Sequence, residues 1–205
     1  MLWYLKKIKH FGILLAFILF MNGLVGCTHT QKYVPEKFAE SDLAIYDSKT
    51  KKEIKLYMKK DEIDKILGTK GESTSNPNTY NYFGLSIYYR DNSTAVLLDL
   101  KNNEAKRFST IRKISTGNTK TDIIKVYGDF ITSDRDLDST SYYVENRDGV
   151  FYYLKYASSP DKTKFEEFDK DKTYIITFYY DEKDIHKQII NRISIFDYKF
   201  GLELK

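Results

Sequence analysis

Four carboxylates between residues 134 and 145 have the types and spacing of a calcium-binding loop. They stand at loop positions 1, 3, 5 and 12, and the residues are Asp134, Asp136, Asp138 and Glu145. Carboxylate oxygens at these positions are ligands that calcium prefers. Position 6, normally glycine, is Ser139, and residues 142–144 look extended rather than helical. A calcium-stabilised envelope module and an ordinary polar loop are therefore both open interpretations.

A second candidate for chemistry is Cys27, the only cysteine of the chain. It follows an uncharged apolar run at 11–21, which itself follows a basic start. A basic segment, an apolar segment and a small residue before the cleavage point, here Gly26, are the three parts of a secretory signal peptide. The alternative is a retained transmembrane helix, but the apolar run is shorter than the roughly 20 residues that span a bilayer. We predict that residues 1–26 form a signal helix that is removed on export.

The end of this signal, Leu24-Val25-Gly26-Cys27, resembles the lipobox of bacterial lipoproteins. The resemblance implies that a signal peptidase recognises Leu24, Val25 and Gly26 and cuts just before Cys27. It also implies that the Cys27 sulfur carries diacylglycerol and that its amino group can receive an N-acyl chain such as palmitate. Two or three acyl chains hold a protein stably on a membrane. We therefore expect a lipid-anchored protein on the extracytoplasmic face of the cell membrane, with no other cofactor.

Removing the signal changes the charge balance. Three of the 33 Lys and Arg side chains lie in the signal, so 30 remain against 29 Asp and Glu, a net charge of +1. Such a chain has no excess of basic residues for nucleic acid. Residues 27–37 are polar, contain Pro35 and show no apolar period, so we predict a flexible tether between lipid and domain.

Nucleophilic and metal-assisted catalysis lack partner residues in this sequence. With Cys27 acylated the mature chain has no free thiol, and its histidines are His29 in the tether and His186 in a polar turn. Carboxylates also cluster at 61–64 and 169–171, where they suit a helix N-terminus and a charged loop. These carboxylates leave one catalytic alternative open, an extracytoplasmic hydrolase acting on cell-wall polymers.

The elements that must position these residues come in two similar halves. Residues 60–68 can be laid over 120–128 at an offset of 60, and in both segments apolar residues fall at i, i+3 and i+4 before a glycine. That spacing predicts a short helix with one buried face and a glycine at its end. Thr119 with Asp122 three residues later predicts a capping box at the start of the second helix.

Strand-like segments rich in tyrosine and aliphatic residues follow each helix. We predict strands at 80–89, 94–100, 149–156, 174–180 and 189–196, and a hairpin from 43–46 and 53–57. The predicted fold class is therefore α+β, with an N-terminal signal helix followed by two tandem repeats of a short helix and an antiparallel β-meander. The repeats would occupy 38–114 and 115–205.

A polar, acidic and aliphatic helix that ends in glycine and precedes an antiparallel sheet resembles the β-lactamase-inhibitor-protein family. The pattern also resembles the small lipoproteins of the outer-membrane assembly machine. The better-matching copy is 115–129, because the first copy has Met58-Lys59 in place of the glycine before the helix. In those families the repeat is a protein-binding scaffold, so the resemblance implies a binding module rather than an enzyme.

Tyrosine pairs at 88–89 and 179–180 lie in predicted strands, where neighbours face opposite sides. One tyrosine of each pair should pack on the helices while the other lies on the open face, where tyrosine makes good contacts with a partner. Ordinary cross-strand packing is the alternative. We expect the protein to bind another envelope protein or an envelope component at the membrane surface.

Overall fold

The part of the chain that the computed structural model describes comprises residues 34–101, 106–129, 138–154, 168–181 and 187–203. These residues belong to one compact unit, Tyr33–Lys205. The predicted signal helix and Cys27 lie outside them. Within the described ranges, no helix is both long and apolar enough to cross a membrane.

Three of the described strands form a small sheet. β1 (Ala44–Asp47) lies in its centre, with β2 (Lys52–Lys55) and β7 (Phe108–Thr110) antiparallel on either side. A 3-10 turn, η2 (Glu40–Leu43), precedes β1. The β1–β2 hairpin confirms the predicted pairing. The sequence does not predict β7, because three residues are too few to show the alternation of buried and exposed residues that marks a strand.

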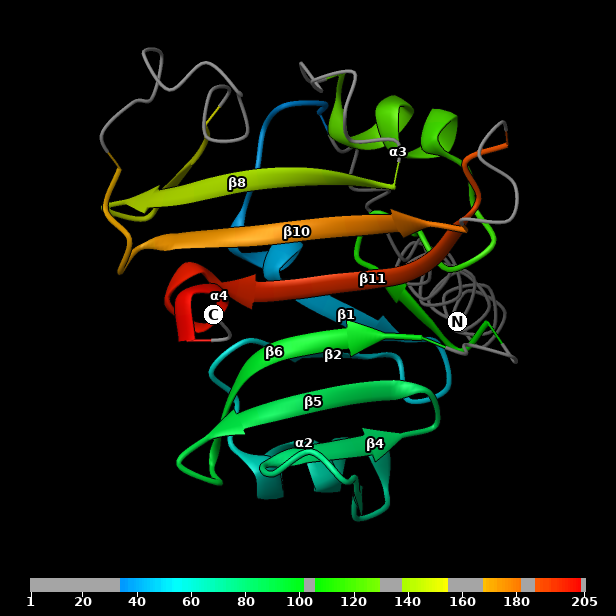
Figure 1. Cartoon of the computed structure of the whole chain (residues 1–205), viewed down its shortest axis with the longest axis vertical. Coiled ribbons are helices and arrows are strands. Elements are labelled where there is room, and N and C mark those ends of the chain that lie inside the picture. Colours follow the sequence, from blue (N-terminus) through cyan, green and yellow to red (C-terminus); the bar gives the residue numbers. More distant parts are fainter. Residues whose placement is uncertain (1–33, 102–105, 130–137, 155–167, 182–186, 204–205) are drawn as a thin grey trace, which may run out of the picture. The chain divides into compact units, whose positions relative to one another are not determined.

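Within the described ranges, the large sheet has eight strands in the order β3-β4-β5-β6-β11-β10-β8-β9, and all neighbours are antiparallel. Its strands are β3 (Glu72–Ser73), β4 (Thr79–Tyr82), β5 (Leu85–Arg90), β6 (Thr94–Leu100), β8 (Ser139–Arg147), β9 (Val150–Tyr153), β10 (Thr173–Tyr180) and β11 (Ile190–Asp197). β6 from the first half pairs with β11 from the second, with Leu98 opposite Ile195. Both halves of the sequence therefore contribute to one continuous sheet (Figure 1).

Two helices occur where the repeated pattern predicts them, α2 (Lys60–Leu67) and α3 (Lys120–Tyr127). The buried residues belong to the predicted apolar faces and are Ile63 and Leu67 in α2 and Ile123 and Tyr127 in α3. The capping box predicted for α3 is present. The Thr119 N–H donates to the Asp122 carboxylate over 3.0 Å, and the Asp122 N–H donates to Thr119 Oγ1 over 3.4 Å.

The strand predicted at 80–89 is wrong as a single element. The chain turns back at Phe83 and Gly84 to form two paired strands, β4 and β5. Both turn residues have positive φ, 56° and 92°, which a two-residue hairpin turn requires and glycine adopts without steric cost. Gly84, a glycine inside a strand pattern, is the residue from which the sequence could have predicted this turn. The strands predicted at 94–100, 174–180 and 189–196 are confirmed as β6, β10 and β11.

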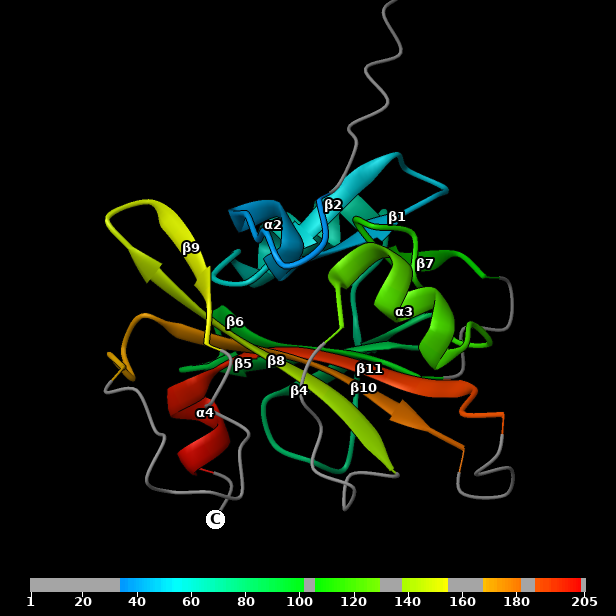
Figure 2. The ribbon, with the colours of Figure 1, turned by 90° about the horizontal axis from the view of Figure 1, so that it is seen from above.

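The core lies between the large sheet and the elements that cover it. α2, α3 and the small sheet cover one face of the large sheet, and α4 (Tyr198–Glu203) lies on the opposite face (Figure 2). The largest fully buried side chains are aromatic: Tyr82, Tyr89, Tyr127, Tyr142, Phe108 and Phe178. The described protein is thus α+β with mostly antiparallel sheets, and several of its tyrosines are core residues.

Candidate functional site

The predicted calcium ligands do not all meet. Asp134 and Asp136 lie outside the described residues, as do Cys27 and the three residues before it. Asp138 directly precedes β8, and Glu145 lies seven residues further on, within the strand. A strand rises about 3.3 Å per residue, so these two residues are about 23 Å apart along β8. The structure does not bring Asp138 and Glu145 together around one ion.

Glu145 is buried and has partners from its own chain. Its Oε2 accepts a hydrogen bond from Arg147 Nε over 2.7 Å, and its Oε1 accepts one from the Asp169 N–H over 3.0 Å. These contacts tie β8 to the segment that leads into β10. In the described part of the chain, no group of three or more His, Cys, Asp or Glu side chains is placed to hold a metal ion. Calcium binding through Asp134 and Asp136 stays a prediction.

In the acidic cluster at 61–64, Asp64 holds neighbouring side chains in place through hydrogen bonds. Asp64 accepts hydrogen bonds from the Tyr82 hydroxyl over 2.7 Å and from Lys60 Nζ over 3.1 Å. Burial alone would raise the pKa of Asp64, but these hydrogen bonds outweigh it and hold the pKa below its usual value. Asp61 and Glu62 are exposed in the first turn of α2. His186 lies outside the described residues.

The predicted alternation of the tyrosine pairs is confirmed, since Tyr89 and Tyr180 are buried and their neighbours are not. The outward tyrosines contact their own chain. Tyr88 packs against Phe200 of α4 with ring centroids 4.7 Å apart, and the Arg192 guanidinium lies 4.7 Å from the Tyr179 ring. This packing leaves neither pair as an open aromatic surface.

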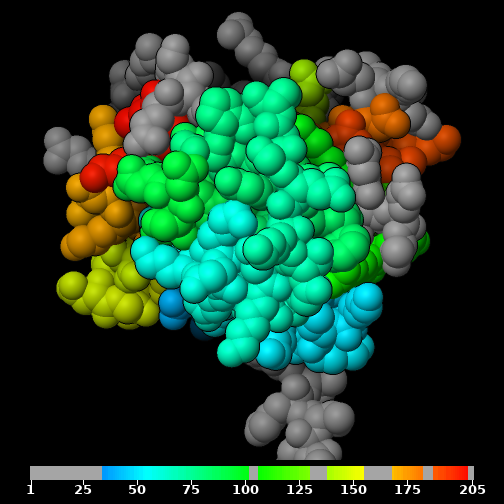
Figure 3. Space-filling view, turned by 90° about the horizontal axis from the view of Figure 1, so that it is seen from below, coloured from blue at the N-terminus to red at the C-terminus, as the bar shows by residue number. Residues whose placement is uncertain are grey.

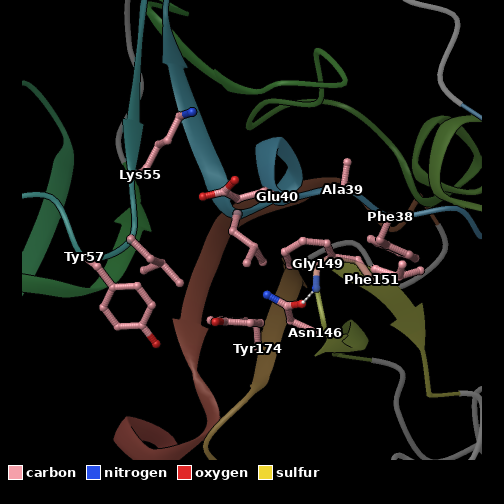
Figure 4. A pocket seen from close by; sticks show the side chains of 12 residues that line it. Phe38, Ala39, Glu40, Lys55, Tyr57, Asn146, Gly149, Phe151 and Tyr174 are labelled. Atoms are coloured by element: carbon pink, nitrogen blue, oxygen red, sulfur yellow. Dashed lines mark hydrogen bonds between the residues drawn. The ribbon is translucent and has the colours of Figure 1, made fainter.

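A hollow of about 460 Å³ lies beside the edge strand β9 (Figure 4). It is lined by the start of the domain, by β2 and the residues after it, by the β8–β9 hairpin and by β10, and the residues are Phe38, Ala39, Glu40, Leu43, Lys55, Leu56, Tyr57, Asn146, Gly149, Val150, Phe151 and Tyr174. We call it the β9 groove. Its volume falls within the range of small-molecule sites, about 300–1,000 Å³.

The walls of the groove are set by backbone pairing. Phe38 forms an antiparallel bridge with Phe151, which places the start of the domain along the outer edge of β9. On the other side, Asn146 Oδ1 accepts a hydrogen bond from the Gly149 N–H over 2.8 Å and closes the β8–β9 turn. A second hollow of about 430 Å³ adjoins the groove and shares Phe38, Val150 and Phe151 with it.

Four of the twelve residues that line the groove are aromatic: Phe38, Tyr57, Phe151 and Tyr174. The Tyr174 ring lies 6.3 Å from the Tyr57 ring and 6.3 Å from the Phe151 ring, measured between centroids. The Tyr57 hydroxyl donates to the Asp197 carboxylate over 3.4 Å. Burial, with the negative charge of Asp197, raises the pKa of Tyr57 and of Tyr174. Both phenols are therefore protonated at neutral pH. Tyr57 already donates its proton to Asp197, so its oxygen can accept a hydrogen bond from a bound molecule, whereas Tyr174 can donate one.

Two opposite charges complete the groove. Glu40 is exposed at one wall, and Lys55 lies at another, where its Nζ is 3.2 Å from Glu53. Glu40 is the only carboxylate among the lining residues described, whereas glycosidases ordinarily use a pair of carboxylates. Aromatic rings, neutral hydrogen-bond donors and one charge of each sign are suited to non-covalent binding of a ligand that has both polar and apolar groups, such as a peptide.

The segment that leads back to Cys27 is fixed to the domain next to this groove. Arg112 Nη1 donates to the Val34 carbonyl over 3.3 Å, and Arg112 Nη2 donates to the Lys37 carbonyl. A Cβ on Gly128 would lie 2.5 Å from Glu36 Cγ, so only glycine allows this close approach. Residues 34–37, predicted as the end of a flexible tether, thus pack on the folded domain.

Comparisons of this chain with protein-family models, curated proteins and solved structures found no match. Sequence reasoning missed the β9 groove, because its lining comes from four stretches of chain that are far apart in the sequence. One signal was available: β9 reads Val-Phe-Tyr-Tyr without a charge or proline, which is unusual for an edge strand.

Proposed function

We propose that this protein is a lipoprotein anchored through Cys27 to the extracytoplasmic face of the cell membrane. In this proposal it binds an extended segment of another envelope protein in the β9 groove. The observation that carries the proposal is the position of the groove. An open, aromatic hollow begins at Phe38, only four residues after the docked Val34 that continues toward the predicted anchor.

The lining of the groove defines the chemistry of the segment it would bind. An apolar or aromatic side chain of the partner would pack against Tyr57, Phe151 and Tyr174, where burial supplies most of the binding energy. A basic group beside it would meet Glu40, and an acidic group would meet Lys55. The phenols and the Asn146 amide can bond to the backbone of the partner.

We further propose that residues 38–114 and 115–205 are tandem copies of one helix-and-meander unit. The support is the offset of 60 residues between α2 and α3, the buried face that each helix has, and the antiparallel pairing of β6 from the first half with β11 from the second. Such a unit would act as a scaffold that holds the β9 groove at one edge of the sheet. Binding function then depends on the groove residues and not on the repeat.

The experiment that tests the proposed function is crosslinking on intact cells, with captured proteins identified by mass spectrometry. Tyr57→Ser should lose the partner, because it removes an exposed ring from the groove. The matched control is Phe83→Ser. Both residues are exposed aromatics, at 44% and 55%, and both have positive φ, 66° and 56°. Phe83 lies in the β4–β5 turn, so its replacement should leave capture unchanged.

The anchor needs its own variant. Cys27→Ala should abolish labelling with a radioactive fatty acid and should also reduce capture, because a tether in the membrane plane raises the effective concentration of partners there. Normal lipid labelling of Cys27→Ala would refute the anchor. Equal capture by Tyr57→Ser and Phe83→Ser would refute the groove as the binding site. Capture of wall glycan in place of protein would favour the hydrolase alternative.

A further inference from the structure

We infer that the domain stands on the bilayer with its β9 edge toward the membrane, and that Val34, Val150 and Tyr152 contact the lipid headgroups. This inference rests on the proposed anchor at Cys27 and names the surface that faces the membrane. Three observations carry it: the docked N-terminal segment, the short chain between that segment and Cys27, and the exposed apolar side chains at this edge.

The first observation is that the domain holds its own N-terminal segment firmly. Arg112, 4% exposed, forms a bidentate ion pair with Asp42, with Nε–Oδ1 2.6 Å and Nη2–Oδ2 2.8 Å. The same guanidinium donates to the carbonyls of Val34 and Lys37. The Glu36 N–H donates to the Tyr127 carbonyl over 2.8 Å. The point at which the chain leaves the domain toward Cys27 is therefore fixed.

The second observation is the length of chain that remains. Cys27 and Val34 are seven residues apart in the sequence, and a fully extended chain of that length spans at most about 25 Å. From β9 to β3 the large sheet crosses seven strand spacings of about 4.8 Å, or about 34 Å. Glu36, Lys37 and Phe38 of the docked segment lie beside β9, so a domain standing on its β3 edge would hold this segment too far from the bilayer for the anchor to reach.

The third observation selects the β9 edge among the orientations that the short chain permits. Val34, Val150 and Tyr152 are 48%, 52% and 45% exposed, and Val150 and Tyr152 lie next to Glu36 and Lys37 in the hollow that adjoins the β9 groove. Valine gains from leaving water, and tyrosine is enriched at membrane interfaces.

The opposite end of the sheet is built differently. The view from below shows a surface formed by the stretch from β2 to β5, including α2 (Figure 3). The edge strand there, β3, has the exposed polar residues Glu72 and Ser73. If this end faces away from the membrane, the β9 groove opens close to the bilayer. The partner segment would then be a membrane-proximal stretch of a membrane-anchored or membrane-spanning protein.

Tryptophan fluorescence can test the orientation, because the only tryptophan, Trp3, lies in the predicted signal and is absent from the processed protein. The acylated mature protein is reconstituted in vesicles of phosphatidylglycerol and brominated phosphatidylcholine, which quenches tryptophan close to the bilayer. Tyr152→Trp should lose most of its emission relative to vesicles without bromine. Phe83→Trp, at the far end of the sheet, should keep its emission. Val150→Trp serves as a second reporter at the β9 edge.

The outcomes separate the inference from the proposed function. A wild-type protein that fails to float with vesicles refutes the anchor and the orientation together. A protein that floats but shows no quenching at 152 and 150, or equal quenching at 83, refutes only the orientation. Inserting about 20 Gly and Ser residues after Thr30 adds about 25 Å of mean reach. If the short chain holds the domain upright, this insertion should lower the quenching at 152.

Discussion

Arg112 offers the sharpest test of how the start of the domain is held. Its side chain is 1% exposed and that of its partner Asp42 is 2% exposed. Arg112→Met keeps most of the volume but leaves the Asp42 charge buried without its cation, and it removes the donor from the carbonyls of Val34, Lys37 and Val126. Breaking a buried pair on one side costs about 3–5 kcal/mol. A loss of about 4 kcal/mol lowers the Tm of a domain this size by roughly 8–16 °C.

The assay is urea unfolding of the unacylated mature chain, followed by circular dichroism, with hydrogen exchange as a local readout. The matched control is Lys125→Met, which breaks an exposed pair with Asp122 at 3.8 Å, where the lysine side chain is 69% exposed. An exposed helical pair is worth no more than about 0.5 kcal/mol. In Arg112→Met the Glu36 amide should also exchange faster, because the hydrogen bonds from Arg112 to the carbonyls of Val34 and Lys37 are lost.

Adding Asp42→Asn to Arg112→Met should recover part of the lost stability, since no uncompensated charge then remains buried. The outcome that would refute this reasoning is a loss below about 1 kcal/mol for Arg112→Met, similar to the Lys125→Met control, with unchanged exchange at Glu36. The start of the domain would then be held by packing alone, and the fixed exit point used to orient the domain on the membrane would need another cause.

The remaining predictions concern pH and calcium. Burial would raise the pKa of Asp47, but hydrogen bonds, chiefly from Arg107, outweigh burial and lower the pKa. The stabilisation that ionised Asp47 provides is therefore present above the pKa of the unfolded chain, about 3.9. It is lost as the pH falls through the pKa of the folded protein. Arg107→Gln should therefore destabilise the protein to urea at neutral pH but little at the lowest pH. Burial raises the pKa of Tyr180 to about 12, so stability should fall between about pH 10 and 12, and less in Tyr180→Phe. If residues 134–138 bind calcium, the ion should raise Tm and Asp134→Ala with Asp138→Ala should abolish the rise; no shift on adding calcium would remove the hypothesis.

Features that depend on short stretches of sequence could be predicted from the sequence alone. The helices at 60–68 and 120–128 follow from apolar residues at i, i+3 and i+4 and a terminal glycine, and the capping box from two side chains three residues apart. The strands at 94–100 and 174–180 follow from their composition. The error at 80–89 was also local, because a two-residue turn centred on Gly84 interrupts the strand pattern only briefly.

The β9 groove could not be predicted from the sequence in this way. The tyrosine pairs at 88–89 and 179–180 drew attention because they are adjacent, yet their outward members pack on Phe200 and Arg192 of their own chain. Tyr57 and Tyr174, which line the groove, are no more conspicuous in the sequence than the others. What distinguishes them is their neighbours in space, and these come from residues more than a hundred positions apart.

The sequence by itself determined the positions of α2 and α3, most of the strands and the predicted export signal, because each depends on residues within about ten positions of one another. Only the tertiary structure decided that β6 pairs with β11, that Arg112 clamps the segment before Phe38, and that a groove lies beside β9. These features depend on which strand edges meet and on where a buried charge finds its acceptors. Contacts between residues distant in sequence set both, and no local pattern encodes them.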